Sequence, residues 1–116
     1  MSNPTVIDRD AVREAIDTGS AVVVEALPAS YYEDAHLPGA LNLPHDSDEA
    51  TIAEVLPVRA APVVVYCSNL ACPNSGMLGR RLAQLGYTDV RVYEAGKEDW
   101  MSAGLPTESG AAVVTG

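Results

Sequence analysis

The segment that decides the fold reads VVVYCSNLACPN and spans residues 63–74. Its first four residues form an apolar, mostly β-branched run, which is typical of a strand buried on both faces of a sheet. Cys67 ends this run, and a short loop leads into a helix whose leucines recur at helical spacing, at positions 78, 82 and 85. Gly86 is the residue expected to end that helix.

Helix and strand signals alternate along the rest of the chain. Strands are predicted over residues 21–25, 40–44 and 90–93, and helices over residues 7–17, 28–34 and 98–103, with a further helix capped by Ser47 or Asp48 and ended by Pro57. This alternation predicts an α/β fold with a mainly parallel central sheet flanked by helices. Such sheets bind ligands beyond the carboxyl ends of their strands, which is where Cys67 follows the predicted central strand.

The composition indicates one acidic globular domain. The chain has 116 residues, with 7 Lys and Arg against 16 Asp and Glu, a formal net charge of −9, and 47% hydrophobic residues. A chain of this size can bury a core without disulfide bonds. We expect residues 1–106 to form the domain and residues 107–116 to form a weakly ordered tail of small residues.

Charge and hydropathy exclude several kinds of partner. Lys97 and six arginines form no basic stripe, so we expect no binding of nucleic acid. No apolar run reaches the ~20 residues that span a bilayer, and residues 1–4 lack the features of a signal peptide. The expectation is a soluble cytoplasmic protein without membrane contact. In that reducing compartment, Cys67 and Cys72 are expected to be reactive or inert thiols rather than a structural disulfide.

The position of Cys67 favours a reactive thiolate. Unpaired backbone N–H groups in a loop and in the first turn of the following helix can converge on an anion, and the positive end of the helix dipole adds to their effect. These groups are expected to lower the pKa of Cys67 below its ordinary value without a metal or a histidine. The alternative is an ordinary buried cysteine at the end of a strand.

Two separated parts of the sequence resemble the rhodanese-like domain family, from about Asp8 to Pro106. The first part is Tyr32 with the segment HLPGALNLP at residues 36–44. The second part comprises Val65-Tyr66-Cys67, the helix end LAQLGY at residues 82–87, the segment VRVYEAG at residues 90–96, and Trp100. The two signatures stand in the family's order, with one cysteine where its nucleophile is expected.

The resemblance implies a three-layer fold and a ping-pong sulfurtransferase without a cofactor. The thiolate of Cys67 would take the outer sulfur of thiosulfate or of a small or protein-bound persulfide. It would carry this sulfur as a cysteine persulfide and pass it to a thiol or to cyanide. The residues implied or considered as substrate-binding are Ser68, Asn69, Leu70, Ala71, Cys72 and Ser75. Ser75 alternatively caps the following helix.

The loop departs from the family pattern in its charge and length. Many active members have an arginine five or six residues after the cysteine, where this chain has Cys72 and Pro73, and the loop is about three residues longer than the short form. Arg80 and Arg81 lie too far into the helix to replace that arginine. These differences favour a neutral or protein-bound sulfur donor over thiosulfate. The family's Asp-x-Arg after the first buried strand is replaced by Glu25-Ala26-Leu27, so an ion pair of that arginine is lost.

Cys72 has two interpretations. It is either a small residue that packs the loop or a resolving thiol that attacks a Cys67 persulfide or sulfenic acid. The four residues between the two cysteines allow the chain to fold back far enough for a disulfide. The second interpretation predicts an intramolecular Cys67–Cys72 bridge after mild oxidation.

Other functions and other polar residues receive less support. A phosphatase would need an arginine at the position of Pro73, whereas a non-catalytic binding module or a redox sensor stays open as the alternative to an enzyme. The histidines and cysteines match no zinc spacing, so no metal is expected. His36 is predicted to hydrogen-bond the turn at Pro38-Gly39, and His45 to be exposed. Trp100 is predicted to be core, and the acidic pairs at residues 33–34 and 98–99 to be solvated helix faces.

Overall fold

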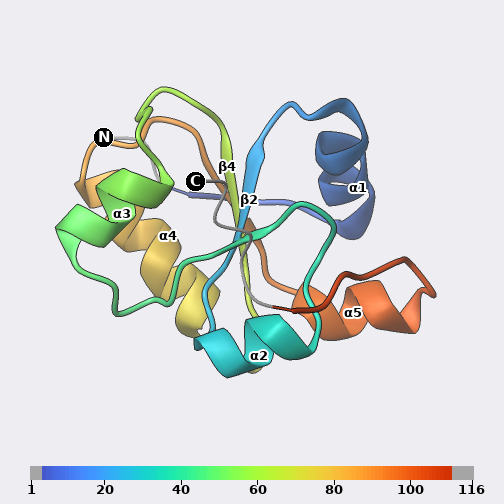
Figure 1. Cartoon of the computed structure of the whole chain (residues 1–116). Coiled ribbons are helices and arrows are strands. Elements are labelled where there is room, and N and C mark those ends of the chain that lie inside the picture. Colours follow the sequence, from blue (N-terminus) through green and yellow to red (C-terminus); the bar gives the residue numbers. More distant parts are fainter. Residues whose placement is uncertain (1–3, 111–116) are drawn as a thin grey trace.

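Five parallel strands form the sheet of the computed structural model, which describes residues 4–110 (Figure 1). The strands are β1 Thr5–Val6, β2 Val22–Glu25, β3 Leu41–Asn42, β4 Val63–Tyr66 and β5 Val90–Tyr93. Their order across the sheet is β1-β5-β4-β2-β3, and each neighbouring pair is parallel. β4 lies at the centre, as the sequence predicts for the strand that ends at Cys67.

Helices cover both faces of this sheet. They are α1 Arg9–Thr18, α2 Ala29–Asp34, α3 Glu49–Val55, α4 Asn74–Gln84 and α5 Gly96–Ser102. Figure 1 shows α3 and α4 on one side of β2 and β4, α1 and α5 on the other side, and α2 beyond the lower strand ends. The predicted three-layer α/β arrangement is therefore confirmed. Within residues 4–110, no helix is both long and apolar enough to cross a membrane.

The ends of the helices follow the local sequence. The Asp48 side chain accepts a hydrogen bond from the Thr51 N–H at 2.8 Å, so Asp48 is the cap of α3 and Ser47 is not. Gly86 follows α4 with a φ of 97°, a left-handed conformation that favours glycine, as expected for the residue that ends this helix. The helix that follows the Cys67 loop, and its end at Gly86, are thus predicted correctly.

Successive side chains of β4 point into two separate cores. Val63 and Val65 pack in the core that includes residues of α3 and α4. Val64 packs in the other core, which contains Trp100 of α5. Because side chains alternate along a strand, Cys67 turns toward α4.

The chain beyond Pro106 is held to the domain, which differs from the predicted boundary. Glu108 and His36 exchange two backbone hydrogen bonds of 2.8 Å in an antiparallel bridge. The Gly110 N–H donates to the Glu33 carbonyl at 2.8 Å. The predicted tail therefore begins too early within the described chain, because backbone pairing that no local pattern announces fixes residues 107–110. Residues 111–116 of that tail lie outside the described residues.

Candidate active site

The backbone around Cys67 is held by the first turn of α5. The N–H groups of Lys97 and Glu98 donate to the carbonyls of Cys67 and Ser68, both at 2.8 Å. Gly96, at a φ of 70°, lies so close that a Cβ atom there would stand 2.6 Å from the Cys67 carbonyl oxygen. This contact explains why a glycine begins α5. It also fixes the position of the Cys67 backbone at the end of β4.

The Cys67 thiol is fully buried and has polar neighbours from the loop and from α4. Its Sγ lies 3.3 Å from the carbonyl oxygen of Cys72, to which the thiol donates. The Ser75 hydroxyl oxygen lies 3.4 Å from the same sulfur. Ser75 is itself buried in the first turn of α4 and makes no capping hydrogen bond, because the cap position is occupied by Pro73. The structure therefore places Ser75 against the Cys67 sulfur. The prediction that Ser75 caps the helix was wrong.

The protonation of Cys67 differs from the sequence-based expectation. Burial raises the pKa of the Cys67 thiol, and hydrogen bonding toward Cys72 raises it further, whereas the Ser75 hydroxyl and N–H lower it. The prediction of a lowered pKa was wrong because the loop covers the sulfur and removes it from water, which outweighs the helix terminus. The resting site holds a thiol that must lose its proton before it can attack.

The pKa of Cys72 shifts in the opposite direction from that of Cys67. Burial opposes ionisation of Cys72, but the neighbouring Cys67 thiol and the N–H groups of Ser68 and Asn74 lower the pKa of Cys72. Cys72 is half-buried, whereas Cys67 is inaccessible. The N–H groups of Ser68 and Asn74 thus favour ionisation of Cys72, whereas the Ser75 N–H and hydroxyl favour ionisation of Cys67.

The remaining predicted binding residues are spread along the loop. The Asn69 carbonyl accepts the Cys72 N–H at 3.0 Å, and the Asn69 side chain joins the Ala71 N–H to Glu98 with two hydrogen bonds of 3.0 Å. Leu70 is 77% exposed, and Ala71 is also exposed. Asn69 therefore shapes the loop, whereas the side chains of Leu70 and Ala71 point away from Cys67.

A shallow depression of about 380 Å³ lies beside the loop. It is lined by Asn69, Leu70, Ala71, Ala95, Glu98, Asp99 and Ser102. Two carboxylates, of Glu98 and Asp99, therefore border this depression, and Asp99 is paired with Arg9 at 3.1 Å. Glu98 is exposed, as the sequence predicts, and accepts a hydrogen bond from Asn69. Asp99 is half-buried and accepts from the Tyr93 hydroxyl at 2.6 Å, so the prediction of a solvated side chain was wrong for Asp99.

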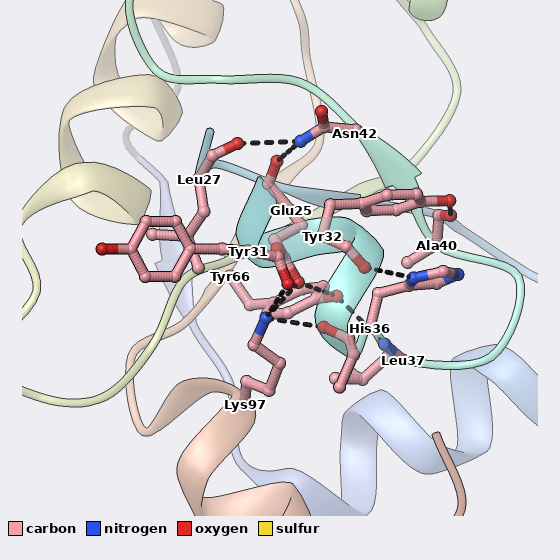
Figure 2. A network of polar contacts seen from close by, with 11 residues as sticks. Glu25, Leu27, Tyr31, Tyr32, His36, Leu37, Ala40, Asn42, Tyr66 and Lys97 are labelled. Atoms are coloured by element: carbon pink, nitrogen blue, oxygen red, sulfur yellow. Dashed lines mark hydrogen bonds and ion pairs between the residues drawn. The ribbon is translucent and has the colours of Figure 1, made fainter. Parts of the chain in front are cut away.

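A buried ion pair supports the same end of the sheet, as Figure 2 shows. The Lys97 ammonium lies 3.1 Å from Glu25 Oε1 and also donates to the carbonyls of Tyr31 and Ala35. The Tyr66 hydroxyl donates to the same carboxylate oxygen at 2.8 Å. Glu25 thus keeps an ion pair, although the family's arginine is absent. Sequence reasoning missed this pair, whose only signals were a charged residue ending a buried strand and the chain's single lysine.

Replacing Lys97 with methionine is expected to lower the free energy of unfolding by about 3–5 kcal/mol. The Glu25 side chain is fully buried and its Oε2 already lacks a hydrogen-bond partner, so loss of the ammonium leaves a buried carboxylate uncompensated. Urea unfolding measures the change. The matched control is the double variant Lys97→Met with Glu25→Gln, which should recover much of the lost stability. Equal stability of the single and double variants would contradict the role assigned to the ion pair.

The histidines have structural surroundings. His36 stacks on the Tyr32 ring at a centroid distance of 3.8 Å, and its Nδ1 lies 2.7 Å from the Tyr32 carbonyl oxygen. The turn at Pro38-Gly39 is bonded by Glu108, whose Oε1 accepts the Gly39 N–H at 2.9 Å, so the partner predicted for His36 was wrong. His45 is half-buried rather than exposed.

Nearby cations are directed away from the sulfur. Arg81 donates to the Ser47 carbonyl oxygen, and the Lys97 ammonium is bonded to Glu25. As predicted, Arg81 does not take the place of the family's loop arginine. Across residues 4–110, no group of three or more His, Cys, Asp or Glu side chains is arranged to hold a metal ion.

Comparison with known proteins relates this chain to one family. Residues 8–103 match the model of the rhodanese-like domain. A curated relative, the HTH-type transcriptional regulator Rv0324 of Mycobacterium tuberculosis, is 29% identical over 100 residues. That match covers 84% of this chain but 42% of the relative, so the chain spans about two fifths of the relative's length.

Solved structures share the fold at lower identity. The BH2092 protein of Bacillus halodurans superposes with a TM-score of 0.81 at 22% identity, covering 90% of this chain and 77% of that one. A thiosulfate sulfurtransferase of Pseudomonas aeruginosa gives 0.80 at 21% identity, covering 97% of this chain and 22% of that one. The fold is therefore shared with proteins of different length.

Proposed function

Because this chain belongs to the rhodanese-like domain family, we propose that it is a sulfurtransferase whose carrier is Cys67. One observation carries the proposal. Cys67 follows the central strand at the carboxyl edge of the sheet, and its sulfur contacts a serine hydroxyl that can donate a hydrogen bond to a thiolate. A structurally similar protein is named a thiosulfate sulfurtransferase, which supports the same reaction class.

The proposed reaction has two displacement steps. The Cys67 thiolate attacks the sulfane sulfur of the donor, the donor's S–S bond breaks, and the departing thiolate or sulfite takes the electron pair. The product is a Cys67 persulfide. An acceptor thiolate then attacks the outer sulfur, and Cys67 leaves as a thiolate. Ser75 stabilises the charge on Cys67 at the start and at the end of this cycle.

We propose a persulfide rather than thiosulfate as the preferred donor. Glu98 borders the depression beside the loop, where Arg9 is already paired with Asp99, and Arg81 and Lys97 are bonded elsewhere. A dianion approaching this edge meets like charge, which raises the free energy of binding.

Steady-state kinetics with both donors and a thiol acceptor test the function. Wild type should transfer sulfur to the acceptor repeatedly, with a higher kcat/KM for a low-molecular-weight persulfide than for thiosulfate. Absence of turnover with either donor would contradict the sulfurtransferase proposal, and a preference for thiosulfate would contradict the donor assignment.

A binding or redox-sensing module is the second candidate. A relative is named as a transcriptional regulator of which the chain spans 42%, and the Cys67 thiol is buried in the resting state. A sensor would accept one sulfur or become oxidised once without sustained transfer. The ratio of product formed to protein present separates the two functions.

Replacing Ser75 with alanine is expected to slow sulfur uptake at neutral pH by roughly 2- to 10-fold, the worth of one hydrogen bond. Ser75 lowers the pKa of Cys67, so its loss raises that pKa and reduces the thiolate fraction. In both proteins the uptake rate should rise with pH, because the thiolate forms as the pH approaches the raised pKa. The pH–rate profile of Ser75→Ala should lie at higher pH than that of wild type, whereas an unshifted profile would remove Ser75 from this role.

A further inference from the structure

The loop places the backbone of one cysteine against the thiol of the other. The Cys67 sulfur lies 3.3 Å from the carbonyl oxygen of Cys72, and both cysteines are free. The hydrogen bond from the Cys72 N–H to the Asn69 carbonyl closes the turn that brings Cys72 back over Cys67. Cys72 is thus half-buried beside the fully buried Cys67.

We propose that Cys72 resolves the Cys67 persulfide, so that the domain releases the carried sulfur as hydrosulfide and is left with a Cys67–Cys72 disulfide. This inference rests on the proposed function, since it concerns the persulfide formed there. It adds a reductive branch to the transfer of sulfur to an external thiol, and it makes the next cycle depend on a dithiol reductant.

The step balances within the site and its donor. The Cys72 thiolate attacks Cys67 Sγ, a bond forms between the two cysteine sulfurs, and the bond from Cys67 Sγ to the outer sulfur breaks. The outer sulfur takes the electron pair and a proton and leaves as HS⁻. The sulfane sulfur is thus reduced by two electrons while the two cysteines are oxidised. A dithiol reductant later returns both thiols by exchange.

Cys72 can resolve the persulfide when no external acceptor thiol is present, because it lies beside the buried sulfur. Cys67 is fully buried, and the backbone carbonyl of Cys72 contacts its sulfur, so the Cys72 thiol is held within the same short loop as its target. Hydrogen bonds also lower the pKa of Cys72 in spite of its burial, which increases its thiolate fraction. The loop tip at Leu70 and Ala71 is exposed, so this part of the loop can move without displacing buried side chains of its own.

The test loads reduced wild type and Cys72→Ser with a low-molecular-weight persulfide and no acceptor thiol. Intact mass and released sulfide are then measured. Cys72→Ser should gain the mass of one sulfur and keep it. Wild type should instead lose the mass of two hydrogens and release sulfide in an amount equal to the protein. Wild type that keeps the added sulfur without releasing sulfide would overturn the inference while leaving the proposed function intact.

A second arm does not depend on sulfur transfer. Mild peroxide oxidises one thiol to a sulfenic acid, which the other thiol converts to a disulfide with loss of water. Peptide mapping should find a Cys67–Cys72 bridge in monomeric wild type, and both thiols free or separately oxidised would overturn the pairing. If neither protein gains sulfur in the first arm, the proposed function is wrong, and a bridge in this arm would then support only redox pairing.

Discussion

Replacing Cys67 with serine is expected to lower the rate of sulfur transfer by at least about a thousandfold, as removal of a nucleophile does in other covalent enzymes. A serine hydroxyl fits the space of the thiol but does not ionise near neutral pH and forms no persulfide. Continuous measurement of the product persulfide with a saturating donor quantifies the loss.

The fold provides the control for this variant. Because the substitution changes one buried atom at the end of β4, Cys67→Ser should keep the circular dichroism spectrum and cooperative thermal unfolding of wild type. A folded variant that still transfers sulfur at a tenth of the wild-type rate or faster would exclude Cys67 as the obligatory carrier and direct attention to Cys72.

Replacing Gly96 with alanine is expected to reduce sulfur transfer by roughly 100-fold, because a displacement of about 1 Å at a reacting group can have that effect. The added Cβ would lie 2.6 Å from the Cys67 carbonyl oxygen and 2.8 Å from the Ser68 carbonyl carbon. Backbone atoms cannot rotate away as a side chain can, so α5 or the loop must shift. The two hydrogen bonds from Lys97 and Glu98 shift with it.

Gly104 is the matched control for Gly96. It also has a positive φ, 74° against 70°, but a Cβ there meets nothing within 4 Å. Gly104→Ala therefore carries the conformational strain without the collision, at a cost of about 1–2 kcal/mol in stability. It should transfer sulfur much faster than Gly96→Ala. Equal activity of the two alanine variants would show that contact with the Cys67 loop is not what Gly96 provides.

The central part of the fold could be predicted because its signals are local. β4 is a run of buried residues, the leucines of α4 recur at helical spacing, and Gly86 has the positive φ expected after a helix. β1 could not be predicted, since Thr5–Val6 is a pair of exposed residues at the sheet edge whose strand conformation depends on pairing with β5.

The site could be predicted only in outline, because its details depend on contacts between distant residues. The position of Cys67 follows from strand order, but its burial depends on how the loop folds over it, and burial decides the direction of its pKa. Glu25 and Lys97 are 72 residues apart and meet only when α5 packs against the sheet. Ser75 faces the sulfur because Pro73 occupies the N-cap position and α4 begins at Asn74. The sequence pattern did not indicate this start of the helix.

Peptide mapping of the loaded protein shows directly whether Cys67 carries the sulfur. Cys72→Ser is incubated with a low-molecular-weight persulfide, its remaining thiols are blocked, and the site of the added sulfur is located by tandem mass spectrometry. We expect one added sulfur on the peptide that contains Cys67, and none when Cys67 is also replaced by serine. A protein that acquires no sulfur, or that keeps the added sulfur after Cys67 is replaced, would contradict the claim that Cys67 is the sulfur carrier.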